Sequence, residues 1–139
     1  METRKAISHA IRMKVSFYDL DPVQIVWHGN YLKYFDDARE ALFSHQGVDL
    51  FEYHDRTSYI FPIIRSSVKH IHPLRRGDEF ICRATVKEAR SKIVVAFEIR
   101  LAADGTLCAR GQTEQAAVLA PQMEMAYAIP EEISRALGF

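Results

Sequence analysis

Two carboxylates, a histidine and an asparagine stand together directly before a predicted helix. Asp19, Asp21, His28 and Asn30 fall within 12 residues. A carboxylate can act as a nucleophile or activate a water molecule without a metal. The unpaired amides and the dipole at a helix N-terminus stabilise a carbonyl oxygen that becomes an oxyanion. The spacing therefore suggests chemistry at a carbonyl group. The structural alternative is that both Asp residues only cap a turn, while His28 packs on an aromatic ring.

The elements that must position these residues are a strand and a long helix. Apolar residues alternate over residues 11–18, which predicts a half-buried strand, and Pro22 requires a loop after it. Apolar residues at helical spacing predict a helix over residues 30–45, with Asn30 as its N-cap and Gly47 as its stop. Its first turn could also begin near residues 26–29.

The rest of the chain alternates as strands do. We expect strands over residues 60–71, 79–88, 93–101 and 107–119, a loop with room for one helical turn over 48–60, and a short helix over 130–139. Asp104-Gly105 separates two of the strands, which is typical of a hairpin, so the last three strands should form an antiparallel meander.

These elements predict one α+β domain over residues 1–139. The long helix has to bury its aromatic face, and an antiparallel sheet of about five strands that curls around it is the simplest two-layer solution. With 139 residues and 48% hydrophobic residues, the chain has enough core to need no metal or disulfide. Cys82 and Cys108 lie inside alternating runs, so we expect them to be free core thiols.

The composition excludes several classes. Equal numbers of acids and bases, 18 of each, argue against a general nucleic-acid binder. No apolar run approaches the roughly 20 residues that span a bilayer, and the first ten residues lack the apolar core of a signal peptide. We therefore expect a cytoplasmic protein without a membrane span.

Residues 17–39, FYDLDPVQIVWHGNYLKYFDDAR, carry a family resemblance. The stretch contains, in this order, an aromatic residue, D-x-D, a hydrophobic pair, an aromatic residue with His, then N-Y and A-R on a helix. This order closely resembles the signature of the 4-hydroxybenzoyl-CoA thioesterase family, whose members have the hot-dog fold. Later strands match in pattern and order. The resemblance implies that Asp21 is the catalytic carboxylate and that His28 lends its backbone amide, and in bacterial relatives also its side chain, to catalysis.

The resemblance also implies an assembly and a carrier. Such proteins form dimers joined edge to edge, often paired again as tetramers, with each active site between subunits. Coenzyme A enters as part of the substrate. For its phosphates we favour the turn Arg90-Ser91-Lys92, since two cations and a hydroxyl suit phosphate oxygens; a solvated hairpin tip is the alternative.

Other residues are expected at the substrate with less specific roles. Trp27, Asn30 and Tyr31 surround the helix start, and Ser66 or Ser67 could position water. Gln24 stands where many relatives have Gly, so the loop is either shaped differently or directs Gln24 toward the acyl group or the water.

His70 and His72 have a spacing compatible with a metal pair, but nothing in the sequence completes the ligand set, so no metal is expected. Ser66 and Ser67 also lack the G-x-S-x-G setting of a serine nucleophile.

The sequence thus favours a thioester hydrolase that converts an acyl-CoA and water into a carboxylic acid and CoA, without a cofactor. The alternatives are a thioesterase acting on acyl carrier protein and a non-catalytic acyl-thioester binding module; a related hot-dog dehydratase fits less well. The zero net charge is a cancellation between an acidic block at residues 19–55, with a net charge of −6, and a basic block at residues 56–110, with +6. A CoA tail would be drawn to the second block while its thioester reached the first.

Overall fold

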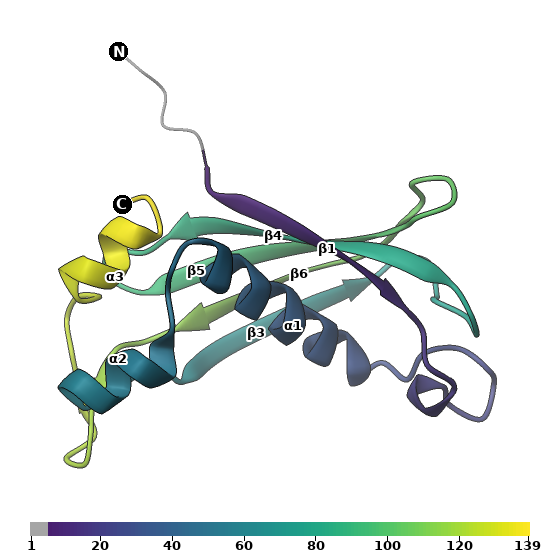
Figure 1. The fold of residues 1–139 in the computed structure, drawn as a ribbon. Helices are drawn as coiled ribbons and strands as arrows, with labels where there is room; N and C mark the ends of the chain where they lie inside the picture. Colours follow the sequence, from purple (N-terminus) through teal and green to yellow (C-terminus); the bar gives the residue numbers. More distant parts are fainter. Residues whose placement is uncertain (1–5) are drawn as a thin grey trace.

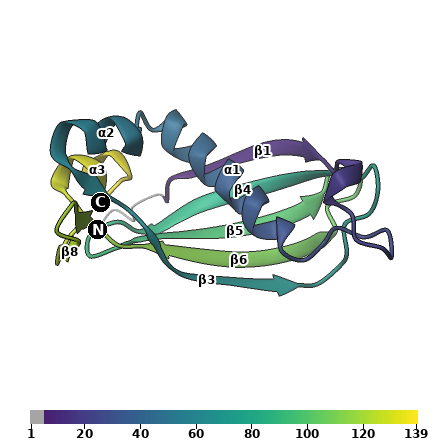
Figure 2. The same cartoon turned by 90° about the horizontal axis from the view of Figure 1, so that it is seen from below.

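A computed structural model describes residues 6–139 and shows one long helix lying on an antiparallel sheet (Figure 1). The helix is α1 (Asn30–His45). The sheet has the strand order β1-β4-β5-β6-β3. Its strands are β1 (Ser8–Lys14), β4 (Glu79–Glu88), β5 (Ile93–Leu101), β6 (Leu107–Gln115) and β3 (Ile63–His70). Figure 2 shows α1 crossing one face of this sheet. The predicted α+β hot-dog arrangement and the β4-β5-β6 meander are confirmed.

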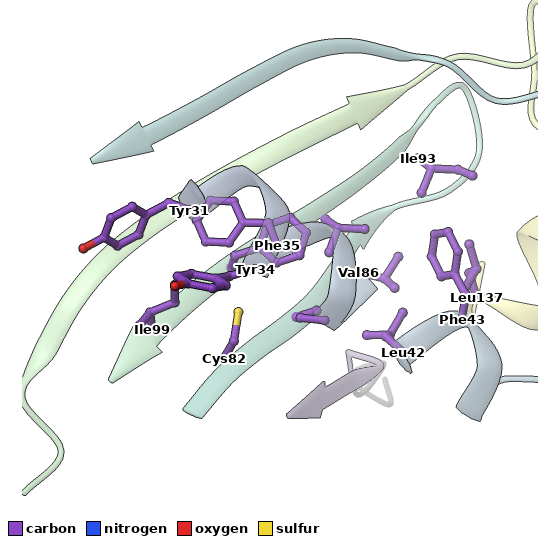
Figure 3. Packing of buried hydrophobic residues seen from close by; sticks show 14 of the residues in the cluster. Tyr31, Tyr34, Phe35, Leu42, Phe43, Cys82, Val86, Ile93, Ile99 and Leu137 are labelled. Carbon is purple, nitrogen blue, oxygen red and sulfur yellow. The ribbon is translucent and has the colours of Figure 1, made fainter. Parts of the chain in front are cut away.

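The core lies between the helix and the sheet. Figure 3 shows Tyr34 of α1 with Cys82 and Ile99 of the sheet, and Leu42 of α1 with Val86 of β4, in one cluster of buried residues. The ring of Phe35 stacks on Phe97 at 4.5 Å between centroids, with only 7° between the ring planes. Cys82 and Cys108 are free and buried, as expected from their place in alternating runs. Burial raises the pKa of the Cys82 thiol to about 12.

Gly111 allows this close approach of helix and sheet. A Cβ atom added there would lie 2.3 Å from the Phe35 ring and 2.6 Å from the carbonyl oxygen of Ser67 on β3. No larger residue fits without moving the helix or the neighbouring strand.

The first strand and the helix start differ from the sequence prediction. β1 ends at Lys14 rather than near residue 18, because residues Phe17–Asp19 form one turn of 3-10 helix in which the amide of Ser16 donates to Asp19 Oδ2 at 3.3 Å. Gly29, not Asn30, is the N-cap of α1. Asn30 does not cap because its side chain is buried and donates to the carbonyl oxygen of Asp19 at 2.9 Å.

The prediction of a loop with room for one helical turn over residues 48–60 underestimates the helix. Leu50–Thr57 form a second helix, α2. Asp49 caps it by accepting hydrogen bonds from the amides of Phe51 and Glu52, and Arg56 forms an ion pair with Glu52 one turn earlier. Such local interactions support a short helix whose apolar pattern is weak.

Two predicted strands are interrupted. Pro62 separates β2 (Tyr59–Ile60) from β3, and residues 116–117 separate β6 from β7 (Val118–Leu119). β2, β7 and β8 (Glu124–Met125) form a small second sheet. The C-terminal helix is confirmed as α3 (Glu131–Ala136), with Pro130 at its N-cap. None of the helices within residues 6–139 is long and apolar enough to cross a bilayer.

Candidate active site

The loop between β1 and α1 is an ordered miniature hairpin that carries Asp21. The amide of Trp27 donates to the carbonyl oxygen of Asp19 at 2.9 Å, and that of Asp21 donates to Ile25 at 2.8 Å. Leu20 and Val26 pair between these two bonds. The amide of Val26 also donates to Leu74 at 2.9 Å, which fastens the hairpin to the segment before β4. Asp21 is therefore held at a defined place in front of the helix.

One oxygen of the Asp21 carboxylate shapes the turn, and the other is available. Oδ1 accepts hydrogen bonds from the amides of Val23 at 2.9 Å and Ile25 at 3.4 Å. Within residues 6–139, no side chain or amide donates to Oδ2. Asp21 is partly exposed. A carboxylate fixed through one oxygen and open through the other can reach a substrate carbon or a water molecule.

Gln24 adopts the conformation that glycine would favour. Its φ is +67°, in the left-handed region, and its amide donates to the carbonyl oxygen of Asp21 at 3.0 Å. Residues with a Cβ atom rarely take this conformation. Gln24 thus fits a turn whose backbone suits glycine, at some cost in strain, and its side chain is exposed beside Asp21.

Asp19 anchors the base of the hairpin. Its Oδ2 accepts hydrogen bonds from the Tyr34 hydroxyl at 2.8 Å and from the Ser16 amide. Its carbonyl oxygen accepts from both Trp27 and the Asn30 side chain. Tyr34 is buried against Phe80 in the core. Burial, followed by the bond to Asp19, raises the pKa of Tyr34 well above its ordinary value of 10.

The start of α1 offers donors for an oxyanion. The amides of Asn30 and Tyr31 already donate to Trp27 and His28. In contrast, the amides of His28 and Gly29 find no acceptor within residues 6–139. The Trp27 ring covers Gly29 so closely that a Cβ atom there would lie 2.2 Å from it. The N-terminus of the helix therefore presents free amides beside an exposed His28 side chain and a half-exposed Trp27 ring.

A histidine that the sequence analysis assigned no role lies at the same place. The ring of His70, at the end of β3, stands edge-on to Tyr31 at 4.7 Å and to His28 at 6.5 Å between centroids. Strand alternation could have indicated this, because His70 shares a face of β3 with Val68, which packs against the core. His70 thus lies at the start of α1 rather than in a metal pair with His72.

Tyr31 is buried, and its hydroxyl oxygen accepts a hydrogen bond from the amide of Leu74 at 3.3 Å. Burial raises the pKa of Tyr31. Its predicted contact with substrate can involve only what little of the ring remains accessible.

Ser66 and Ser67 are exposed on β3, the edge strand of the sheet. Ser66 shares the helix-facing side with Val68 and His70, whereas Ser67 points to the opposite side. The structure therefore separates the two serines.

The turn Arg90-Ser91-Lys92 does not meet Asp21 within one chain. β4 begins beside the hairpin, where the amide of Val15 donates to Asp78. The turn follows the far end of this ten-residue strand, which is about 30 Å long, and lies next to the residues that lead into α3. Lys92 is bound to Glu114 at 2.6 Å, and this hydrogen bond lowers the pKa of Glu114. The Ser91 hydroxyl donates to Glu88 at 3.1 Å, while Arg90 has no carboxylate partner within residues 6–139.

Within the same described range, no group of three or more His, Cys, Asp or Glu side chains is arranged to hold a metal ion. The chemistry available at the hairpin is that of a carboxylate, free backbone amides and two imidazole rings.

Comparisons with known proteins agree with this geometry. The chain is 31% identical over 88 residues to an acyl-CoA thioesterase, YbgC, of Helicobacter pylori, and the match covers 63% of each protein. It therefore spans less than two thirds of that relative. In structure the chain is similar to a 1,4-dihydroxy-2-naphthoyl-CoA thioesterase from Synechocystis, with a TM-score of 0.86 and 21% identity over 94% of this chain and 95% of the other.

A second solved structure, 4-hydroxybenzoyl-CoA thioesterase from Pseudomonas sp. strain CBS-3, matches with a TM-score of 0.80 and 20% identity over 96% of this chain and 99% of the other. The family model of the thioesterase-like superfamily matches residues 15–137, which include the hairpin, α1 and the whole sheet except β1. On this match, and with the hairpin and helix arranged as described, the chain belongs to the thioesterase-like superfamily.

Proposed function

We propose that the protein hydrolyses the thioester of an acyl-CoA. The observation that carries this proposal is the half-satisfied Asp21 carboxylate in front of the free amides of His28 and Gly29. A carboxylate that attacks or activates water and a set of oxyanion donors are together able to hydrolyse a thioester. The H. pylori relative, an acyl-CoA thioesterase, supports the same assignment.

In this reaction Asp21 attacks the thioester carbonyl carbon or activates the water molecule that does so. The amides at the start of α1 stabilise the negative charge that develops on the carbonyl oxygen, and the helix dipole adds to this. The bond from carbon to sulfur then breaks. Water supplies the hydroxyl group of the acid, and CoA leaves as its thiol. We propose that no cofactor is needed beyond the CoA of the substrate.

Binding of the CoA phosphates at the turn Arg90-Ser91-Lys92 requires a second chain. Because about 30 Å of β4 separates the hairpin from Arg90, the phosphates of a substrate at Asp21 would be bound by Arg90 and Lys92 of another copy. We propose a homodimer or homotetramer in the cytoplasm. The exposed edge strand β3, with Ile63 and Ile64 43% and 51% exposed, supports pairing between copies.

The decisive experiment is Asp21→Asn assayed with a panel of aliphatic and aromatic acyl-CoAs, with free thiol as the readout. We expect kcat to fall by about 10²-fold or more while acyl-CoA binding is largely kept, because the amide can neither attack nor take a proton. Asp55→Asn is the matched control, since Asp55 is exposed on α2. Turnover by Asp21→Asn at the wild-type rate would refute the assignment.

The same assay separates the two alternatives. Saturable binding without thiol release by the wild type would indicate a binding module. Arg90→Ala with Lys92→Ala should weaken activity on CoA thioesters; if it lowers activity only on acyl carrier protein, the carrier is that protein and not free CoA.

A further inference from the structure

The imidazole of His70, at the end of β3, lies at the site but has no role in the reaction proposed for Asp21. The backbone after it is fixed on β6, because the amides of residues 71 and 72 donate to the carbonyl oxygen of Cys108 at 2.9 and 3.0 Å. The His70 side chain lies on the helix-facing side of β3, which it shares with Val68. Figure 2 shows the end of β3 at the same end of the molecule as the start of α1 and the β1–α1 loop.

A rigid wall orients the His70 ring. The ring stands edge-on to Tyr31, with 4.7 Å between centroids and 85° between the ring planes. Tyr31 is buried, and its hydroxyl oxygen accepts a hydrogen bond from the amide of Leu74 at 3.3 Å. The carbonyl oxygen of Leu74 in turn accepts from the amide of Val26 in the hairpin at 2.9 Å. Leu74 therefore connects the ring that orients His70 with the hairpin that carries Asp21.

The nitrogen atoms of the His70 ring are unoccupied. No residue in 6–139 forms a hydrogen bond or an ion pair with this ring, and the side chain is exposed. In contrast, Nδ1 of His54 lies 3.0 Å from the carbonyl oxygen of Tyr59. The groups that face the His70 ring are the rings of Tyr31 and His28, and neither is a carboxylate. A neutral imidazole with a free nitrogen can take a proton from water near neutral pH.

The reaction needs such a base when Asp21 itself attacks the thioester. The attack joins Asp21 to the acyl group as an anhydride, so Asp21 can then no longer activate water. The free amides of His28 and Gly29 hold the carbonyl oxygen from a second direction. Water has to reach the acyl carbon from a direction that neither group occupies. His70 comes from a third segment, and its ring lies 6.5 Å from that of His28.

We propose that His70 is the general base for hydrolysis of the acylated Asp21, an inference that rests on the proposed hydrolase function. In the first step the Asp21 carboxylate displaces the CoA thiolate from the acyl carbon. In the second step the oxygen of water bonds to this carbon while one proton of the water passes to His70. The bond from the carbon to the Asp21 oxygen breaks, which releases the carboxylic acid and restores the carboxylate. The proton on His70 then passes to the CoA thiolate.

The test compares His70→Phe with His72→Phe on the acyl-CoA of the panel that the wild type hydrolyses fastest. Phenylalanine keeps a ring against Tyr31 and removes the base. His72 is the matched control, since it is an exposed histidine two residues further along the chain. We expect kcat of His70→Phe to fall by about 10²-fold or more, the usual scale of general-base catalysis, and kcat of His72→Phe to stay near that of the wild type.

Rapid quenching separates a base from a residue that only packs. In His70→Phe we expect a burst of about one thiol per active site followed by slow turnover, because the acylated enzyme accumulates. Mass spectrometry of the digested protein should then find the acyl group on Asp21. In His70→Ala, added imidazole should restore turnover, because it takes the proton in place of the missing side chain.

The role of His70 is overturned if His70→Phe turns over as fast as His72→Phe. It is also overturned if turnover falls with neither a burst nor acylated Asp21. Both results leave the hydrolase function intact, because the wild type still releases thiol, whereas a wild type that hydrolyses no thioester would refute that function itself. If His70→Phe does not fold, His70→Ala decides: rescue by imidazole supports the role, and its absence overturns it.

Discussion

At the scale of single residues, the two carboxylates of D-x-D have different tasks. Asp21 keeps one oxygen free, whereas Asp19 uses its side chain and its carbonyl oxygen to tie the hairpin to Ser16, Trp27, Asn30 and Tyr34. Their contacts separate a group that can react from a group that positions it. If both Asp residues only capped a turn, both oxygens of each carboxylate would have local donors. This holds for Oδ1 of Asp21 but not for its Oδ2, which has no donor within residues 6–139.

The Tyr34 bond to Asp19 gives a first prediction about stability. Tyr34→Phe removes a buried hydrogen bond to a carboxylate, so we expect the free energy of unfolding to fall by about 2 kcal/mol near neutral pH, measured by chemical denaturation. Tyr127→Phe is the control, since Tyr127 is fully exposed. A loss no larger than that of the control would show that the bond contributes nothing to stability.

The same pair gives a dependence on pH. The folded state holds the pKa of Tyr34 above the unfolded value of 10, so the stability from this group is complete below pH 10 and falls as the pH rises further. We expect the unfolding free energy of the wild type to fall by up to about 1.4 kcal/mol more than that of Tyr34→Phe for each pH unit above about 10. Parallel curves for the two proteins would contradict this.

At the scale of elements, the site depends on three segments far apart in the sequence. The hairpin is fastened to Leu74 before β4, the start of α1 supplies the free amides, and the end of β3 brings His70 against Tyr31. α1 can hold this position because its aromatic face packs tightly on the sheet, with Phe35 stacked on Phe97 over Gly111.

Gly111 therefore tests the contact between helix and sheet. Gly111→Ala places a methyl group where the Phe35 ring and the Ser67 carbonyl oxygen now lie, so we expect a loss of about 1–3 kcal/mol in unfolding free energy from overpacking. The neighbouring variant Gln112→Ala should lose much less, because that side chain is exposed. Equal losses in thermal or chemical denaturation would mean that the contact is not tight.

At the scale of the whole molecule, the separation of charge has a structural counterpart. The acidic block contains the hairpin, α1 and most of α2, and the basic block contains β3, β4 and the turn with Arg90 and Lys92. Because the hairpin and that turn lie at opposite ends of β4, one chain alone cannot bring both ends of an acyl-CoA together at Asp21 and Arg90 in the way proposed. Binding of the CoA phosphates by Arg90 therefore belongs to the proposed assembly and not to one chain.

Pairing of copies through the edge strand β3 is tested by a charge on it. Ile64→Lys puts a charge on an exposed apolar position of β3, so we expect the dissociation constant of the proposed dimer to rise by about tenfold or more in sedimentation equilibrium. Met125→Lys is the control, because Met125 is 63% exposed on β8, outside the five-stranded sheet. Identical self-association of both variants would place the interface elsewhere.

The sequence by itself determined the features that depend on local pattern. Apolar alternation along the strands and helical spacing over residues 30–45 predicted the α+β fold. A strand or helix that buries one face repeats its apolar residues every 2 or about 3.6 positions, so the pattern is visible in the sequence. The motif around Asp21 indicated the family for the same local reason. Short-range signals were weaker at α2, where capping by Asp49 rather than apolar spacing supports the helix.

Only the tertiary structure decided which residues share a place. The bonds of Asp19 to Tyr34 and Asn30 and the contact of the His70 and Tyr31 rings join residues distant in the sequence. The placement of the hairpin and the Arg90 turn at opposite ends of β4 separates two groups that the sequence analysis assigned to one substrate. Pairing at such range is set by strand order, register and packing, which no local pattern contains.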